Sequence, residues 1–173
     1  VSSLIELQNG AKPVAMLTGQ PEQHYLLSGS GGYGFIAKLG DMVGRVKAGK
    51  VVMTVDSGET VLPPIAVYAS SLINPDCKIV LASSDHRLLA FSIGELKVMP
   101  KGRGLQLMSL TEGASLEHVL VTTAAEFIVE TVGKRGAAHQ EKLRICDIEG
   151  KRGKKGKVLD ISGRLKTLSA ASE

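Results

Sequence analysis

The stretch LLSGSGGYGFIAKLGD at residues 26–41 is repeated 54 residues later as VLASSDHRLLAFSIGE at residues 80–95. In both, a short apolar run leads into a polar or glycine-rich turn, a second apolar run and an acidic residue, Asp41 or Glu95. Two short apolar runs around such a turn predict a β-hairpin. Internal repetition at this spacing indicates an array of similar structural units.

A basic turn containing glycine follows each repeated stretch. Lys47-Ala48-Gly49-Lys50 precedes an apolar run at 51–55, and Lys101-Gly102-Arg103-Gly104 precedes another at 105–110. Each unit therefore reads as a hairpin, an acidic corner, a basic glycine turn and further short strands.

A third, looser unit completes the pattern. Its apolar run at 127–129 is followed by a glycine turn at 133–136, a strand-like run at 143–148 and the basic turn at 150–156. The order of parts is that of the first two units, so a third related unit is expected.

Strands alternate with turns along the whole chain, and no long helix is predicted. The predicted strands cover residues 24–28, 35–39, 51–55, 65–69, 78–82, 87–93, 105–110, 116–122, 126–131, 142–147 and 157–161. Short helical turns are predicted at 39–43 and 93–97, where apolar residues recur three or four apart.

The fold class predicted from these patterns is all-β, a propeller-like array of about three four-stranded blades. The repeats span roughly 18–70, 71–122 and 123–166 within a single domain at 1–166, and 167–173 is predicted to be a disordered tail. One four-stranded unit cannot bury both of its faces alone, so neighbouring units must pack together and place their basic turns at equivalent positions.

Composition is typical of a globular domain, with 43% hydrophobic residues. The chain begins at Val1 with no visible targeting peptide. No apolar run approaches the roughly 18 residues that span a membrane, so a soluble cytoplasmic protein is expected.

Cys77 and Cys146 lack metal-site spacing and are expected to be buried free thiols.

Charge is concentrated near the end of the chain. Residues 134–166 contain eleven Lys or Arg against four Asp or Glu, a net charge of +7, whereas residues 1–133 carry a net charge of −2. One strongly basic region is typical of a surface that meets a polyanion. Nucleic acid is the leading partner, and an anionic membrane is second.

Two motifs resemble catalytic or cofactor sites. Gly29–Gly34 satisfies G-x-G-x-x-G, but a strand-like run follows it instead of a helix, which favours a hairpin over a nucleotide loop. Ser84, Asp85 and His86 are consecutive and cannot form an in-line triad. The four histidines are scattered, so no catalytic residue, metal site or cofactor is predicted.

The basic turn at 150–157 places five cations among three glycines, where ammonium groups and backbone amides can reach phosphate oxygens. The scarcity of aromatic residues favours double-stranded DNA over stacked single strands. Eleven cations are predicted to contact DNA: Lys47, Lys50, Lys101, Arg103, Lys134, Arg135, Lys151, Arg152, Lys154, Lys155 and Lys157.

Over nearly its whole length the sequence resembles the C-terminal domain of the A subunit of bacterial DNA topoisomerase IV, a relative of the gyrase A-subunit tail. The stretches that carry this resemblance are Gly32-Tyr33-Gly34-Phe35, the turns at 47–50 and 101–104, Leu62-Pro63-Pro64 and Val132-Gly133-Lys134-Arg135. The resemblance implies a β-pinwheel whose basic rim binds and bends duplex DNA beside the cleavage core, without chemistry of its own.

The resemblance also implies partners and a role. The parent would be an ATP-dependent type II topoisomerase, in which this domain positions the transported segment for decatenation and supercoil relaxation. Its partners there would be the rest of its own subunit, plus the ATPase subunit. Residues Val1 to about Leu17 would be the remnant of a preceding blade. Gly150–Gly156 lacks the glutamine of the gyrase box, Gln-Arg-Arg-Gly-Gly-Lys-Gly, which argues against gyrase-style wrapping.

Three alternatives remain open from sequence. The first is a protein-interaction propeller whose basic segment docks an acidic partner. The second is a gyrase-type DNA-wrapping domain. The third is a nucleotide-dependent enzyme that uses Gly29–Gly34, which predicts stabilisation by ATP or NAD.

Overall fold

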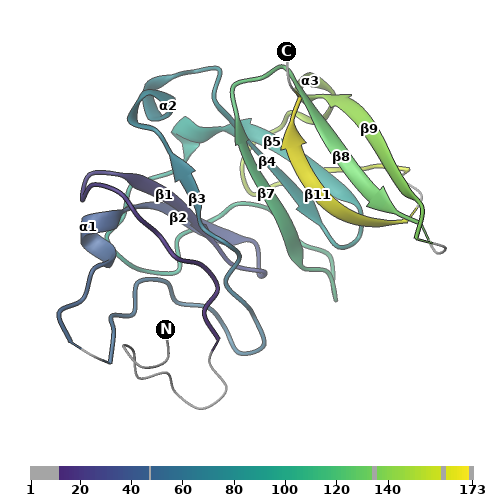
Figure 1. Cartoon of the computed structure of the whole chain (residues 1–173). Coiled ribbons are helices and arrows are strands. Elements are labelled where there is room, and N and C mark those ends of the chain that lie inside the picture. The colour runs from purple at the N-terminus through teal and green to yellow at the C-terminus, as the bar shows by residue number, and fades with distance from the viewer. Residues whose placement is uncertain (1–11, 47, 134–135, 161–162, 172–173) are drawn as a thin grey trace.

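The computed structural model describes residues 12–46, 48–133, 136–160 and 163–171, which form three small antiparallel sheets arranged side by side (Figure 1). The first sheet has the order β3 (Ile65–Val67), β1 (His24–Ser28), β2 (Tyr33–Lys38) and β6 (Leu105–Gln106). The second has the order β10 (Lys157–Val158), β5 (Arg87–Ser92), β4 (Lys78–Ser83) and β7 (Leu116–Thr122). The third has the order β11 (Arg164–Ala170), β8 (Glu126–Val132) and β9 (Ala138–Arg144).

Each sheet is built on one hairpin, and the three hairpins are equivalent. Leu26 pairs with Ile36 in the β1–β2 hairpin, and Val80 pairs with Ala90 in the β4–β5 hairpin, which preserves the 54-residue offset seen in the sequence. The β8–β9 hairpin has the same arrangement. The predicted hairpins are confirmed.

A short helical turn follows the second strand of every hairpin. These turns are α1 (Leu39–Met42), η1 (Ile93–Glu95) and α3 (Ile145–Ile148), and the first two confirm the predicted turns. One further short helix, α2 (Ala69–Ile73), follows β3. Among the described residues no helix is long and apolar enough to cross a membrane.

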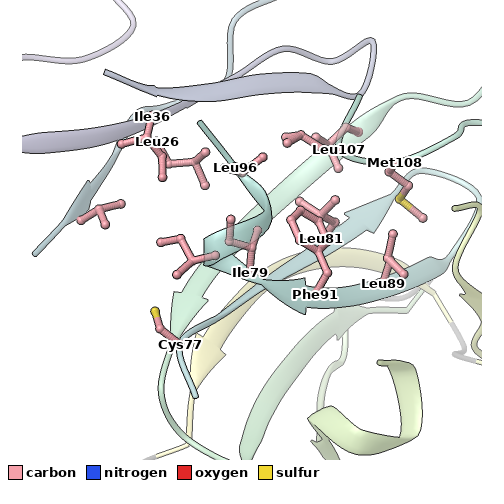
Figure 2. Close-up of a cluster of buried hydrophobic side chains, with 13 residues drawn as sticks. Leu26, Ile36, Cys77, Ile79, Leu81, Leu89, Phe91, Leu96, Leu107 and Met108 are labelled. Carbon is pink, nitrogen blue, oxygen red and sulfur yellow. The ribbon is translucent and has the colours of Figure 1, made fainter. Parts of the chain in front are cut away.

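The core lies between neighbouring sheets, because side chains alternate across each strand. From β4, Ile79 and Leu81 point toward the first sheet, where they meet Leu26 and Ile36 in one cluster (Figure 2). Val80, the residue between them, belongs to a second cluster shared with the third sheet. The middle sheet is therefore buried on both faces, which explains the nearly continuous apolar runs of its strands.

The strand after the second and after the third basic turn, at 101–104 and 150–156, joins the sheet of the preceding repeat. β6 pairs with β2 through Tyr33 with Gln106 and Gly34 with Leu105. β10 pairs with β5 through Leu88 with Lys157 and Arg87 with Val158. The expectation that each block of sequence builds its own four-stranded sheet is therefore wrong, because the chain crosses to its neighbour at the basic turn.

Three further expectations need correction. Residues 51–55 form no strand and make only an isolated bridge between Met53 and Gly102. The third sheet has three strands among the described residues instead of four. Residues 167–170 are not a disordered tail, because they belong to β11 and pair with β8.

The two cysteines have different environments. Cys77 is 1% exposed and lies in the core, and desolvation by burial raises its pKa. Cys146 is exposed, so its predicted burial is wrong. It lies at the start of α3, where the preceding residue, Ile145, fills the core position.

Candidate nucleic-acid interface

Three basic turns connect the acidic corners to the crossing segments. We call residues 45–50 the first basic turn, 100–104 the second and 150–157 the third. Each has a glycine with positive φ at its last position or one residue earlier, at Gly49 (79°), Gly104 (88°) and Gly156 (73°). This backbone conformation favours glycine, so the recurring exit glycine specifies the same way out of each turn.

The second basic turn is fastened to the segment that follows the first. The Gly102 amide donates to the Val52 carbonyl at 2.9 Å, and the Gly102 carbonyl accepts from the Thr54 amide at 3.0 Å. The two turns are therefore held at adjacent positions by backbone hydrogen bonds.

The third basic turn repeats this arrangement one unit further on. The Gly153 amide donates to the Leu107 carbonyl at 2.8 Å, and the Lys154 carbonyl accepts from the Ser109 amide at 3.1 Å. Residues 107–109 directly follow β6 and thus the second turn. The second turn is thus attached to the segment after the first turn, and the third turn to the segment after the second.

The exit glycines of the second and third turns lie against a hairpin strand. A Cβ added to Gly104 would lie 2.3 Å from the Gly34 carbonyl oxygen, and one added to Gly156 would lie 2.4 Å from that of Leu88. Only glycine permits this approach, which brings each turn onto the edge of the preceding sheet.

Two of the predicted lysines also fasten the turns. The Lys50 Nζ donates to the Asp41 carbonyl, and the equivalent Lys157 Nζ donates to the Asp147 carbonyl, both at 2.5 Å. Both lysines remain exposed. A hydrogen bond to a neutral carbonyl does not neutralise the ammonium charge. Each lysine can therefore stabilise the conformation of its turn and still attract an anion.

Two of the three predicted arginines, Arg103 and Arg152, are directed toward the protein. Arg103 forms ion pairs with Asp56 at 2.7 Å and Glu59 at 3.5 Å, and its guanidinium lies 4.0 Å from the centre of the Tyr33 ring. The Arg152 Nη1 donates to the Gln106 carbonyl at 2.6 Å. Their side chains thus stabilise the turns instead of extending into solvent.

The remaining described lysines among the predicted contacts present exposed side chains. These are Lys101 in the second turn and Lys151, Lys154 and Lys155 in the third. Lys47, Lys134 and Arg135 lie outside the described residues. Sequence reasoning missed Arg45, an exposed cation in the first turn whose signal was its position two residues before Lys47.

The hairpin tip next to the third turn carries a polar cluster. Asp85 accepts hydrogen bonds from Ser83, Thr111 and Arg87, and the Arg87 Nη1 reaches the Gly156 carbonyl at 3.5 Å. Burial alone would raise the pKa of Asp85, but these hydrogen bonds together hold it below its ordinary value of 3.8. The three consecutive residues Ser84, Asp85 and His86 form a turn, as predicted.

The glycine motif Gly29–Gly34 forms the end of the β1–β2 hairpin, as predicted. The Gly29 amide donates to the Tyr33 carbonyl at 2.9 Å, and Gly32 has a φ of 80°. A strand, β2, continues from it where a nucleotide loop would require a helix.

Comparison with known proteins agrees with this architecture. The chain is 71% identical over 170 residues to the A subunit of DNA topoisomerase 4 from Neisseria gonorrhoeae, a match that covers 98% of this chain and 22% of the relative. The chain belongs to the family of topoisomerase IV A subunits. The corresponding protein of Escherichia coli K12 is 26% identical over 164 residues, covering 90% of this chain and 21% of that one.

Solved structures show the same fold. The C-terminal domain of ParC from Escherichia coli matches with a TM-score of 0.83 at 23% identity, covering 97% of this chain and 68% of that chain. The DNA gyrase A C-terminal domain matches with a TM-score of 0.71 at 21% identity, covering 99% of this chain and 58% of that chain. The predicted all-β, β-pinwheel fold is confirmed. No family model matches the chain.

The chain spans about a fifth of the length of the topoisomerase IV relatives that it matches. The resemblance inferred from the glycine turns is confirmed at the level of the family.

Proposed function

We propose that this domain binds double-stranded DNA along its three basic turns, as the non-catalytic DNA-positioning part of a type II topoisomerase. In the parent protein it would hold the transported segment for decatenation and supercoil relaxation. Its partners there would be the rest of its own subunit, plus the ATPase subunit. No catalytic residue, metal or cofactor is assigned to it, and the expected setting is the bacterial cytoplasm.

The stepwise attachment of the turns is the observation that carries this proposal. Backbone hydrogen bonds join Gly102 to the segment after the first turn and Gly153 to the segment after the second. A double helix presents phosphates at regular intervals, and cations repeated along one edge can contact several of them at once.

The side chains support non-specific contact with phosphates. Lys101, Lys151, Lys154 and Lys155 are exposed on the second and third turns, where their ammonium groups can reach phosphate oxygens. Long flexible lysines carry little sequence information by themselves, so binding should depend on salt far more than on base sequence.

The test compares two charge-matched double variants in duplex binding measured by fluorescence anisotropy. Lys154→Gln with Lys155→Gln removes two cations from the third turn, and Lys142→Gln with Lys166→Gln removes two from β9 and β11. Each pair lowers the net charge from +4 by two. The matched charge separates a local contact from a general electrostatic effect.

We expect the third-turn variant to bind DNA more weakly and to reduce the slope of log K against log salt by about 1.8, or roughly 0.9 per phosphate contact. The β9 and β11 variant should keep most of the wild-type slope. Equal losses in both variants, or an affinity that does not change with salt, would refute the proposed interface.

A further inference from the structure

The tip of the third basic turn is fastened to the second repeat through successive residues. The Arg152 amide donates to the Glu95 carboxylate at 3.2 Å, and the Arg152 Nη1 donates to the Gln106 carbonyl at 2.6 Å. The Gly153 amide donates to the Leu107 carbonyl at 2.8 Å. Among the described residues, the Glu95 carboxylate is the only side-chain group that accepts a hydrogen bond from the backbone of this turn. A substitution can therefore remove this contact and leave the backbone contacts in place.

The backbone that carries Glu95 is firmly anchored. Glu95 is the last residue of η1 and lies between Ile93 and Leu96, two buried residues of the core between the first and second sheets (Figure 2 shows Leu96). The Leu96 amide donates to the Ile93 carbonyl at 3.0 Å, and the Gly94 amide donates to the Ser92 hydroxyl oxygen at 3.4 Å. The carboxylate therefore offers the third turn an acceptor in a defined place.

The second basic turn is restrained in a different way. There, Asp56 and Glu59 form ion pairs with the side chain of Arg103. Glu95 instead bonds to a backbone amide, which fixes the path of the third turn while Lys154 and Lys155 stay exposed.

We infer that Glu95 is a positioning residue of the third basic turn, an acidic side chain that strengthens the binding of DNA. The inference rests on the proposed function of this turn. A turn that is already ordered loses less conformational freedom when it binds phosphates. An acid near a binding surface repels a polyanion, so the role assigned to Glu95 is opposite to the one that its charge alone predicts.

Two substitutions at this position separate the hydrogen bond from the charge. Glu95→Gln and Glu95→Ala each remove one negative charge from a chain of net charge +4, but the side-chain oxygen of glutamine can still accept from the Arg152 amide. In duplex binding measured by fluorescence anisotropy, Glu95→Gln should bind at least as tightly as wild type. Glu95→Ala should bind about threefold more weakly than Glu95→Gln, the scale of one net hydrogen bond.

Glu112→Gln and Glu112→Ala are the matched control pair. Glu112 is an exposed acid in the loop between β6 and β7 and takes no part in the contacts of the third turn described above. These two variants should bind DNA equally. Equal binding by the two Glu95 variants, tighter binding by Glu95→Ala, or the same difference within the Glu112 pair would overturn the inference.

Amide hydrogen exchange measures the contact without DNA. The Arg152 amide should exchange about threefold faster in Glu95→Ala than in Glu95→Gln, because it loses its acceptor. The Gly102 amide, which donates to the Val52 carbonyl in the second turn, is the reference and should exchange equally in both. Unchanged exchange at Arg152, or an equal increase at Gly102 from a general loss of stability, would contradict a local role for Glu95.

The double variant Lys154→Gln with Lys155→Gln, measured in the same series, distinguishes failure of the inference from failure of the proposed function. If it binds DNA as tightly as wild type, the proposed function fails and the inference fails with it. If it binds more weakly while the two Glu95 variants bind alike, only the role of Glu95 is refuted.

Discussion

A strand of one repeat joins the sheet of the preceding repeat at two places, and we call each of them a joint. The two joints have the same backbone arrangement and differ in their side chains. At the first joint, β6 lies on β2, and Arg103 covers the Tyr33 ring while paired with two carboxylates. At the second joint, β10 lies on β5, and Arg87 stands at the position of Tyr33, held by Asp85. The repeated backbone fixes where a turn lies, whereas the side chains decide which cations stay available to a ligand.

The largest expected effect tests the shared backbone. Gly104→Ala and Gly156→Ala should each lower the free energy of unfolding by about 3 kcal/mol, because the methyl group combines positive-φ strain with a collision against a strand carbonyl. Gly49→Ala introduces the positive-φ strain without a collision, because a Cβ added there meets no atom within 4 Å, and it should cost about 1 kcal/mol. Urea unfolding of the three variants measures the difference, and equal costs would show that the close approach is unimportant.

A smaller effect distinguishes the second joint. Asp85→Asn should lower the free energy of unfolding at pH 7 by about 1 kcal/mol, because it weakens charge-assisted hydrogen bonds from Thr111 and Arg87. The pKa of Asp85 is lowered by folding, so its contribution is present above the unfolded value and is lost as the pH falls through the folded value.

Wild type and Asp85→Asn should therefore converge in stability at acidic pH, below the ordinary value of 3.8. Unfolding curves from pH 7 to acid measure this convergence. Glu112→Gln, at an exposed acid in the loop after Thr111, serves as the control. A difference between wild type and Asp85→Asn that persists unchanged into acid would contradict the assigned role of the carboxylate.

The smallest effect concerns Arg103 at the first joint and rests on the proposed DNA binding. Asp56→Asn with Glu59→Gln removes both carboxylates that form ion pairs with this arginine. The positive charge of the second turn is then no longer offset by these two acids. We expect duplex DNA to bind about fourfold more tightly at low salt, the scale of an exposed ion pair. Asp76→Asn with Glu112→Gln changes the net charge equally elsewhere, and an equal gain there would exclude a specific role for Arg103.

Sequence reasoning located the hairpins well because their signals are local. Alternating apolar residues around Gly29–Gly34 and Ser83–His86 are enough to predict a strand, a tight turn and a returning strand. It failed at residues 51–55, whose apolar character resembles that of β6 although no described sheet edge lies beside them. It also missed β11, where charged and polar residues such as Arg164 and Lys166 occur in a strand at the edge of its sheet.

The prediction of the DNA-contacting residues was limited in the same way. All of the predicted cations that the structure describes lie on the basic turns, as the glycine spacing indicated. Composition could not distinguish the exposed Lys154 from Arg103, whose partners Asp56 and Glu59 lie more than forty residues away in the chain. The DNA contacts themselves stay a prediction.

By itself, the sequence determined the repeat, the hairpins and the positions of the basic turns, because apolar alternation and the conformational freedom of glycine act over a few residues. The tertiary structure alone decided that β6 and β10 join the preceding sheets and that Arg103 and Arg152 point inward. Strand pairing and ion pairing depend on which distant segments meet in space, and that information belongs to the folded chain as a whole.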